Sequence, residues 1–182
     1  SGTNLPSSGQ DGVRLWDLRQ GAFVQQYGLP DTSLPVLPRL RNVLFMPDGQ
    51  SVLGLSGENS TLRLYDRDSG ELLQSIVYLG NIVPFYGGGL DVTPDGSRVL
   101  LGTTWGALLY DLESGTPLRK FVHDPKFQGL VSYIDISPDG RTALTGEQNV
   151  EEGIVLWDLD TGQALHRFFT SPDVLRDWHN QC

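Results

Sequence analysis

Apolar and polar residues alternate in short runs along most of the chain. Ser51-Val52-Leu53-Gly54-Leu55 and Thr61-Leu62-Arg63-Leu64-Tyr65 show the pattern, and both runs are rich in Val and Leu. Alternation with a period of two residues indicates a β-strand with one face toward a core, whereas an amphipathic helix repeats near 3.6 residues. The pattern therefore predicts an all-β protein.

A tract of seven residues occurs four times in this chain. Its centre is an aromatic residue followed by Asp, found at Trp16-Asp17, Tyr65-Asp66, Tyr110-Asp111 and Trp157-Asp158, which recur every 45–49 residues. A second marker, Pro-Asp-Gly, falls between these pairs at positions 47–49, 94–96 and 138–140. Two markers that share one period indicate a repeat architecture, in which each repeat is one supersecondary unit.

Each period contains four segments with the strand pattern. In the second period we place strands near 42–46, 51–56, 61–66 and 71–77, with the Pro-Asp-Gly turn after the first and an Asp-Ser-Gly turn after the third. Glycine supplies the positive φ of a tight hairpin, and the preceding Asp bonds its own backbone. We therefore expect structural roles, not catalytic ones, for the Asp residues of both markers.

These residues resemble a known family. The Trp-Asp or Tyr-Asp pairs, the turn Ser137-Pro138-Asp139-Gly140 and the tract Asp11–Asp17 are similar to WD40 repeats of the degenerate, bacterial-like kind, over roughly residues 5–170. The resemblance implies a β-propeller, with blades of four antiparallel strands around a central channel. The Gly-His dipeptide usual before each first strand is missing, and only His123 stands near its place. We therefore do not expect the family's His-to-Trp hydrogen-bond network.

About three and a half blades are expected within residues 1–170. They are a half blade at 12–27 and blades at about 41–77, 87–122 and 131–169. A ring needs typically 4–8 blades, so we expect the first two strands of the opening blade to lie before Ser1 and the ring to be completed by a larger protein, a complex or another copy. Residues 171–182 form a tail that reads as a short helix, with Ser171 as its cap.

Charge and composition exclude several classes of function. With 13 Lys and Arg against 22 Asp and Glu, the net charge of −9 disfavours a nucleic-acid partner, because phosphate binding needs clustered cations. No apolar run reaches the 18 residues of a membrane span, so no membrane insertion is expected. The single cysteine, Cys182, leaves the compartment undetermined.

Candidate catalytic chemistry is sparse. The chain has three histidines, His123, His166 and His179, and no metal-ligand spacing, so we expect no catalytic residue, no metal and no cofactor. The alternative is a ligand- or cofactor-binding propeller, quinoprotein- or lactonase-like, with a site at the channel mouth. Asp91 and Asp135 recur at equivalent places in two first strands. In that alternative they bind a cation; otherwise they have a structural role. The run Gly87-Gly88-Gly89 is expected to permit close packing near the axis.

The connections between successive blades are long and apolar. They run approximately over 28–40, 78–86 and 123–130. The resemblance implies that these connections and the turns between second and third strands line the top face used for partners. The residues expected there to contact a partner are Leu37, Arg39, Arg41, Phe85, Tyr86, Trp105, Lys126, Phe127 and Glu147.

The alternative is that these loops fold over the blade seams and bury their own side chains. If the loops instead contact a partner, the sequence predicts a non-enzymatic scaffold or sensor module within a larger protein or complex. Its partners are expected to be proteins or other copies of the chain.

Overall fold

The computed structural model describes residues 4–9, 12–27, 40–56, 61–77, 88–123, 129–147 and 153–168. Within these ranges all regular secondary structure is β, which confirms the predicted fold class. The strands form four antiparallel sheets, each with its strands in chain order. We number the sheets 1 to 4 along the chain.

Sheet 1 has three strands and the other sheets have four. Sheet 1 consists of β1 (Asn4–Gly9), β2 (Gly12–Asp17) and β3 (Ala22–Tyr27). Sheet 2 consists of β4 (Leu40–Phe45), β5 (Ser51–Ser56), β6 (Thr61–Asp66) and β7 (Leu72–Val77). Sheet 3 consists of β8 (Leu90–Val92), β9 (Arg98–Thr103), β10 (Gly106–Asp111) and β11 (Pro117–Phe121). Sheet 4 consists of β12 (Val131–Ile136), β13 (Thr142–Glu147), β14 (Ile154–Asp158) and β15 (Ala164–Phe168).

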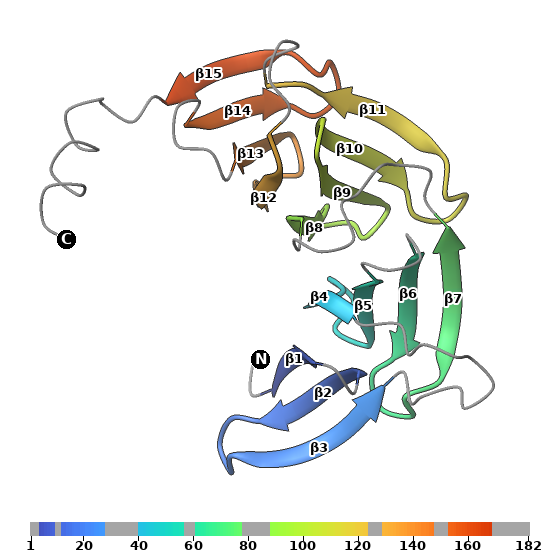
Figure 1. Cartoon of the computed structure of the whole chain (residues 1–182). Helices are drawn as coiled ribbons and strands as arrows, with labels where there is room; N and C mark the ends of the chain where they lie inside the picture. Colours follow the sequence, from blue (N-terminus) through green and yellow to red (C-terminus); the bar gives the residue numbers. More distant parts are fainter. Residues whose placement is uncertain are drawn as a thin grey trace, which may run out of the picture.

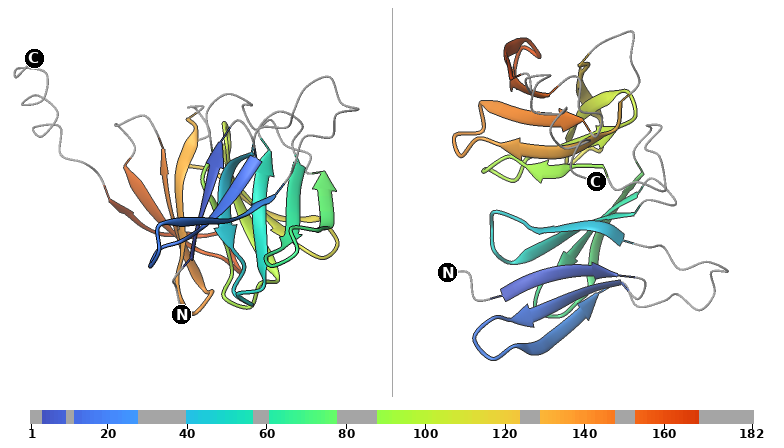
Figure 2. Two further views of the ribbon diagram at one scale, coloured as in Figure 1. Left: turned by 90° about the horizontal axis from the view of Figure 1, so that it is seen from below. Right: turned by 60° about the vertical axis from the view of Figure 1, so that its left-hand side comes forward.

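The four sheets stand side by side in an arc that is open on one side (Figure 1). The first strands β4, β8 and β12 lie on the inside of the arc, and the last strands β3, β7, β11 and β15 lie on its outside. The views in Figure 2 show the same stack of twisted sheets from two further directions. This is the arrangement of propeller blades around part of a ring.

The opening sheet differs from the half blade that the sequence predicts. The half blade at 12–27 has only two strands, but β1 pairs with β2 along its whole length, from Asn4↔Asp17 to Gly9↔Gly12. The stretch Leu5-Pro6-Ser7-Ser8-Gly9 does not alternate clearly, so sequence pattern assigned it only the end of a strand. The backbone hydrogen bonds of β2 decide its conformation instead, and sheet 1 has three strands.

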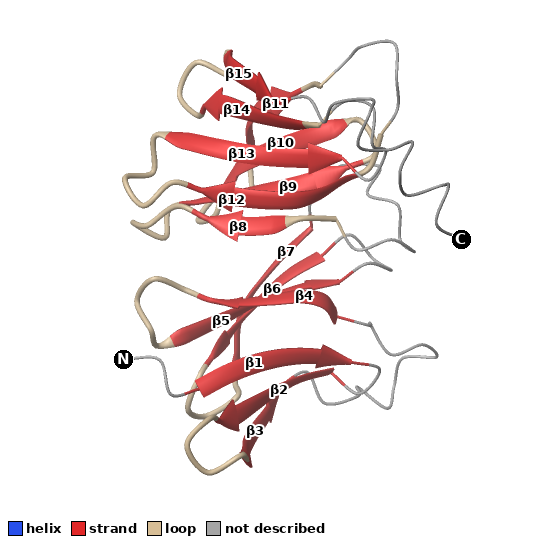
Figure 3. Ribbon diagram, turned by 90° about the vertical axis from the view of Figure 1, so that its left-hand side faces the viewer, coloured by secondary structure: helices blue, strands red, loops and turns tan. Residues whose placement is uncertain are grey.

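The tight turns follow the expected chemistry. The glycines of the three Pro-Asp-Gly turns, Gly49, Gly96 and Gly140, have φ of 67°, 73° and 69°. Asp48 Oδ1 accepts hydrogen bonds from the backbone N–H of Gln50 and of Ser51, at 2.8 and 3.0 Å. The prediction for these turns is confirmed. In a four-stranded meander they share an edge with the turns between third and fourth strands, and Figure 3 shows these tight turns together at one edge.

The core consists of three apolar clusters, one at each seam between neighbouring sheets. The repeat aromatic of each later sheet points back into the seam: Tyr65 lies 5.9 Å from Tyr27, and Trp157 lies 5.6 Å from Phe121, between ring centroids. Tyr110 is likewise buried with apolar residues of sheet 2. Each buried side chain of this size stabilises the fold by roughly 1.5–3 kcal/mol, so the repeat aromatic holds sheet to sheet.

A polar contact accompanies each seam at its outer edge. In sheets 1 to 3, one side chain of the last strand donates a hydrogen bond to a backbone carbonyl in the next sheet's last turn. The three contacts are Gln25 Nε2 to Ser69 O at 3.2 Å, Gln74 Nε2 to Glu113 O at 3.2 Å, and Arg119 Nη1 to Thr161 O at 2.9 Å.

In the turns that receive Gln25 and Arg119, a glycine makes room for this contact. A Cβ on Gly70 would lie 2.6 Å from Gln25 Nε2, and one on Gly162 would lie 2.7 Å from Arg119 Cδ. Both glycines also have positive φ, of 76°. The recurring glycine therefore serves the turn and the neighbouring sheet at once.

Candidate interaction surface

Trp105 is presented at the edge of the sheets opposite the Pro-Asp-Gly turns, in the turn between β9 and β10. Its side chain is 43% exposed. The buried hydroxyl of Thr103 fixes the turn, because it accepts from Trp105 N at 3.1 Å and donates to Gly106 O at 2.9 Å. A large aromatic side chain on an anchored backbone is well suited to contact a partner.

Most of the other residues expected to contact a partner lie outside the described residues. These are Leu37, Arg39, Phe85, Tyr86, Lys126 and Phe127. Arg41 belongs to β4, for which the backbone course is described at this position. The predicted helical tail at 171–182 also lies outside. Their part in a binding face stays a prediction.

Glu147 differs from the expectation that it lines the rim of a contact surface. Its side chain is only 4% exposed, and its Oε1 lies 3.6 Å from Nδ1 of His123, whose side chain is fully buried. Position 147 is the last residue of β13, and the sequence predicts a turn after it, so sequence position suggested a solvent-facing carboxylate. Its proximity to a buried histidine draws it inward instead.

A buried polar network links His123 to the repeat aromatic of sheet 4. Trp157 Nε1 donates to Thr145 Oγ1 at 2.7 Å, and Thr145 Oγ1 lies 2.5 Å from His123 Nε2. The expectation that such a His-to-Trp network is missing is therefore wrong for this sheet. Sequence reasoning missed Thr145 in β13. Its hydroxyl joins His123 to Trp157, and the histidine by itself did not indicate this contact.

Burial decides the charge of the histidine. The Thr145 hydroxyl accepts from Trp157, and it either donates to His123 Nε2 or accepts from it, according to which ring nitrogen carries the proton. Burial, together with the smaller effect of the nearby charge of Arg167, lowers the pKa of His123 to about 4. Arg167 also donates to the backbone O of His123 at 2.7 Å. The imidazole is therefore neutral at physiological pH.

Asp91 is one of the two carboxylates considered for a cation site, and it accepts hydrogen bonds from backbone N–H groups. Its Oδ1 accepts from Val92 N at 2.8 Å and its Oδ2 accepts from Ile136 N of the next sheet at 2.7 Å. Both oxygens thus have donors, which supports a structural role. Asp135, on β12 of sheet 4, has an exposed side chain. Among the residues that the structure describes, no three His, Cys, Asp or Glu side chains form a group that could hold a metal ion.

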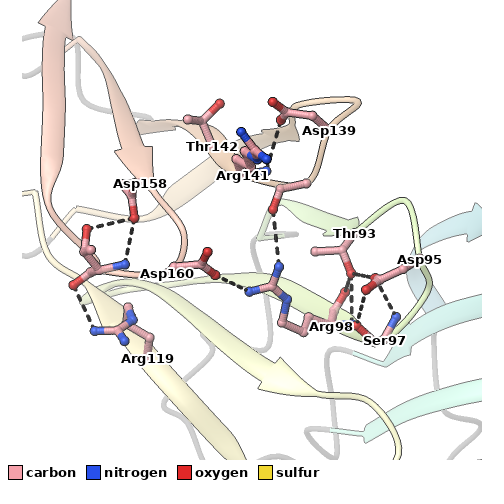
Figure 4. A network of polar contacts seen from close by, with 12 residues as sticks. Thr93, Asp95, Ser97, Arg98, Arg119, Asp139, Arg141, Thr142, Asp158 and Asp160 are labelled. Carbon is pink, nitrogen blue, oxygen red and sulfur yellow. Dashed lines mark hydrogen bonds and ion pairs between the residues drawn. The ribbon is translucent and has the colours of Figure 1, made fainter.

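A polar network at the turn edge joins sheets 3 and 4 (Figure 4). Arg98 pairs with Asp160 at 2.9 Å and also donates to Gly140 O at 3.3 Å. In the adjoining turn, hydrogen bonds from the hydroxyl of Thr93 and from Ser97 lower the pKa of Asp95 to about 2. These carboxylates are committed to turns and to the seam. No helix in the described ranges is long and apolar enough to cross a membrane.

The buried hydroxyl of Thr145 is testable by substitution. A Thr145→Val variant keeps the shape but leaves Trp157 Nε1 and His123 Nε2 without their partner, and each buried unpaired group costs about 1–3 kcal/mol. We expect chemical denaturation to show a loss of about 2–4 kcal/mol in the free energy of unfolding. Thr116→Val, at an exposed turn, is the matched control and should change it by less than about 0.5 kcal/mol. Equal losses would contradict the network.

The neutral buried histidine predicts a pH dependence of stability. The pKa of His123 is about 4 in the folded state and about 6.5 in the unfolded state. Between these values the unfolded chain binds a proton that the folded chain does not, so stability falls as the pH falls from 7 to 5. Thermal unfolding measured across this range checks the prediction. His123→Gln should remove this part of the dependence, and an unchanged slope in that variant would contradict it.

Comparison with known proteins agrees with this architecture. A search against protein-family models finds no matching model. The chain is 34% identical over 64 residues to an uncharacterized WD repeat-containing protein of Synechocystis sp., a match that covers 35% of this chain and 17% of that protein. It is 26% identical over 170 residues to WD repeat-containing protein 82 of Drosophila melanogaster, covering 90% of this chain and 49% of the fly protein.

The chain thus spans about half the length of the fly relative and less of the cyanobacterial one. Both relatives carry the kind of repeat that the Trp-Asp and Pro-Asp-Gly markers indicate, and the structure builds these markers into antiparallel sheets set around an arc. The resemblance of this chain to WD40-repeat proteins is therefore confirmed by its relatives and agrees with its blade-like sheets.

Proposed function

We propose that the chain is a non-enzymatic module for protein interaction, which holds a partner on the edge of the sheets where Trp105 lies. The relatives' WD repeats favour a scaffold kind of function. The observation that carries the proposal is the exposed indole of Trp105 on a turn anchored by the buried Thr103. The partner is a protein, in a larger protein or complex.

The physical basis is a rigid frame that presents side chains with little loss of entropy on binding. The seam clusters hold the sheets, so the backbone at the β9–β10 turn is ordered before a partner arrives. Large aromatic side chains dominate binding energy at interfaces because they bury much area with few rotatable bonds. The other residues predicted to contact a partner, apart from the buried Glu147, would extend this surface.

Substitution of Trp105 tests the proposal. With the purified chain as bait and a bound protein identified by cross-linking, Trp105→Ala should weaken binding by at least about tenfold, because removing a hot-spot aromatic costs about 2 kcal/mol or more. The measurement is the Kd by calorimetry or interferometry, alongside the thermal midpoint. The midpoint should stay nearly constant, since the indole is exposed.

Leu118→Ala provides the matched control. Leu118 is 49% exposed on β11, the outer strand of the same sheet, so its loss removes a similar exposed apolar group away from the proposed face. A partner that binds both variants equally well would contradict docking at Trp105. A partner sensitive only to Leu118 would move the interface to the outer edge.

A further inference from the structure

The last strand of every sheet carries a β-bulge at the same place. In sheet 2 Tyr65 pairs with Leu72 and Leu64 pairs with Gln74, so Leu73 is an extra residue on β7. The same shift of register occurs in the other three sheets, where the extra residues are Val24, Leu118 and Leu165. The bulge therefore belongs to the repeat and is not an irregularity of one sheet.

A large aliphatic side chain stands at each bulge, and it is exposed. Val24, Leu73, Leu118 and Leu165 are 48%, 53%, 49% and 51% exposed. The residue before each of them is also apolar, so the pairs are Phe23-Val24, Leu72-Leu73, Pro117-Leu118 and Ala164-Leu165. Half of the exposed large apolar side chains in the described ranges belong to these pairs. We call the four pairs the outer row, since their strands lie on the outside of the arc (Figure 1).

The exposure of the outer row does not come from the lack of a neighbouring sheet. Sheets 2 and 3 have an apolar seam on both sides, yet Leu73 and Leu118 are as exposed as Val24 and Leu165. The seams bury other apolar residues of the same outer strands, such as Phe121 on β11. Exposed apolar groups that gather in one part of a surface are typical of interaction sites.

The bulges restrict the kind of segment that can bind there. An extended peptide adds to a sheet by pairing its backbone with an edge strand. A bulge interrupts that pairing and twists the edge, which is one way in which proteins protect exposed edge strands. Strand β11 also begins with Pro117, which has no backbone N–H to donate. A partner therefore contacts the outer row through side chains, as an amphipathic helix does.

Carboxylates border the outer row on the side of the tight turns. Glu71 directly precedes Leu72, and the backbone O of Glu113 accepts from Gln74 Nε2 at 3.2 Å, at the outer end of the seam between sheets 2 and 3. Both glutamate side chains are exposed, and neither forms an ion pair with another residue that the structure describes. This border therefore attracts cationic groups of a partner.

The other border of the outer row has a different charge. The exposed Lys120 comes two residues after Leu118, farther from the turns. Arg119, between them, donates to Thr161 O of the next sheet at 2.9 Å. A complementary helix therefore has its cations along one flank of its apolar stripe, the flank that faces the turns.

We propose that the outer row binds an amphipathic helix of a partner protein. Its apolar stripe contacts the bulge leucines of neighbouring sheets, and its Lys or Arg flank faces Glu71 and Glu113. A helix of about 18 residues spans roughly 27 Å, which is enough to reach from one sheet to the next, since packed sheets lie about 10 Å apart. The inference does not depend on the function proposed for Trp105, which lies in the turn at the opposite edge of sheet 3.

A designed peptide tests the proposal on the 182-residue chain. The peptide has about 18 residues, with Leu along one helical face, Lys along one flank of that face and Gln elsewhere. Fluorescence anisotropy of the labelled peptide should show saturable binding with a Kd of roughly micromolar size. Leu73→Ser combined with Leu118→Ser should weaken this binding at least about tenfold. Val77→Ser, which changes a 65% exposed residue at the other end of β7, is the control and should leave the Kd nearly unchanged.

The charged border is tested by a substitution of its own. Glu113→Gln should weaken peptide binding about two- to fivefold at low salt, and this difference should vanish at high salt. Asp135→Asn is the matched control, because it removes one exposed carboxylate from β12, on the inside of the arc. An equal loss in both variants would mean that only the net charge attracts the peptide, which would contradict a border at the outer row.

The helical form of the partner is tested with a second peptide. It has the same residues with Leu in alternate positions, which favours a strand. We expect it to bind at least about tenfold more weakly than the helical peptide, because the bulges prevent edge pairing. Tighter binding of the alternating peptide would overturn the proposal in favour of an added strand.

A thiol at a bulge reports the contact directly. Leu118→Cys, combined with Cys182→Ser, should react with a maleimide at least about tenfold more slowly when the helical peptide is present at saturation. An unprotected thiol, or peptide binding that the two serine substitutions leave unchanged, would overturn the proposal. Trp105→Ala should not alter binding of this peptide. If it did while the serine substitutions had no effect, the peptide would bind at the Trp105 edge instead of the outer row.

Discussion

The packing of one sheet's repeat aromatic against the sheet before it is the contact on which the rest of this structure depends. Tyr65 on Tyr27 and Trp157 on Phe121 place apolar rings inside the seams, where the three clusters of the core are found. Strand pairing alone would give four separate sheets, each with two apolar faces in water. The seams convert them into one arc and bury the faces between them.

The same packing explains why the carboxylates and the buried histidine described here serve the fold. The carboxylates of the turns accept backbone hydrogen bonds, Asp91 ties one first strand to the next, and His123 is a neutral member of a buried network. The surface proposed to contact a partner lies at the edges of this frame, and Trp105 is a part of it whose anchored backbone and exposed side chain are described.

Sequence alone predicted the sheets because local pattern and turn chemistry agree with the repeat. The strands 51–56 and 61–66 lie where the alternation places them, and the glycines of the Pro-Asp-Gly turns have the positive φ their turns require. Strand β1 was underestimated because its pairing with β2, not its own composition, sets it. Pairing of this kind is long-range information that alternation does not carry.

The candidate site was predicted less well, for a similar reason. Glu147 looked like an exposed turn residue until His123, far away in sequence, was found beside it. The Thr145 link between His123 and Trp157 also requires three segments to meet in space. Trp105 was singled out because an aromatic residue in a tight turn is unusual by itself, and its contact with a partner stays a prediction. Contacts between repeats join residues that are distant in sequence, so the pattern within one repeat does not predict them.

Hydrogen exchange of individual backbone amides tests the central role of the seams most directly. If seams hold the fold, amides of sheets 2 and 3, which have a neighbour on both sides, should exchange markedly more slowly than amides in equivalent strands of sheets 1 and 4. Amides of β5 and β9 should then be the best protected. Uniform protection across the four sheets, or slower exchange in sheet 4 than in sheet 3, would contradict the account.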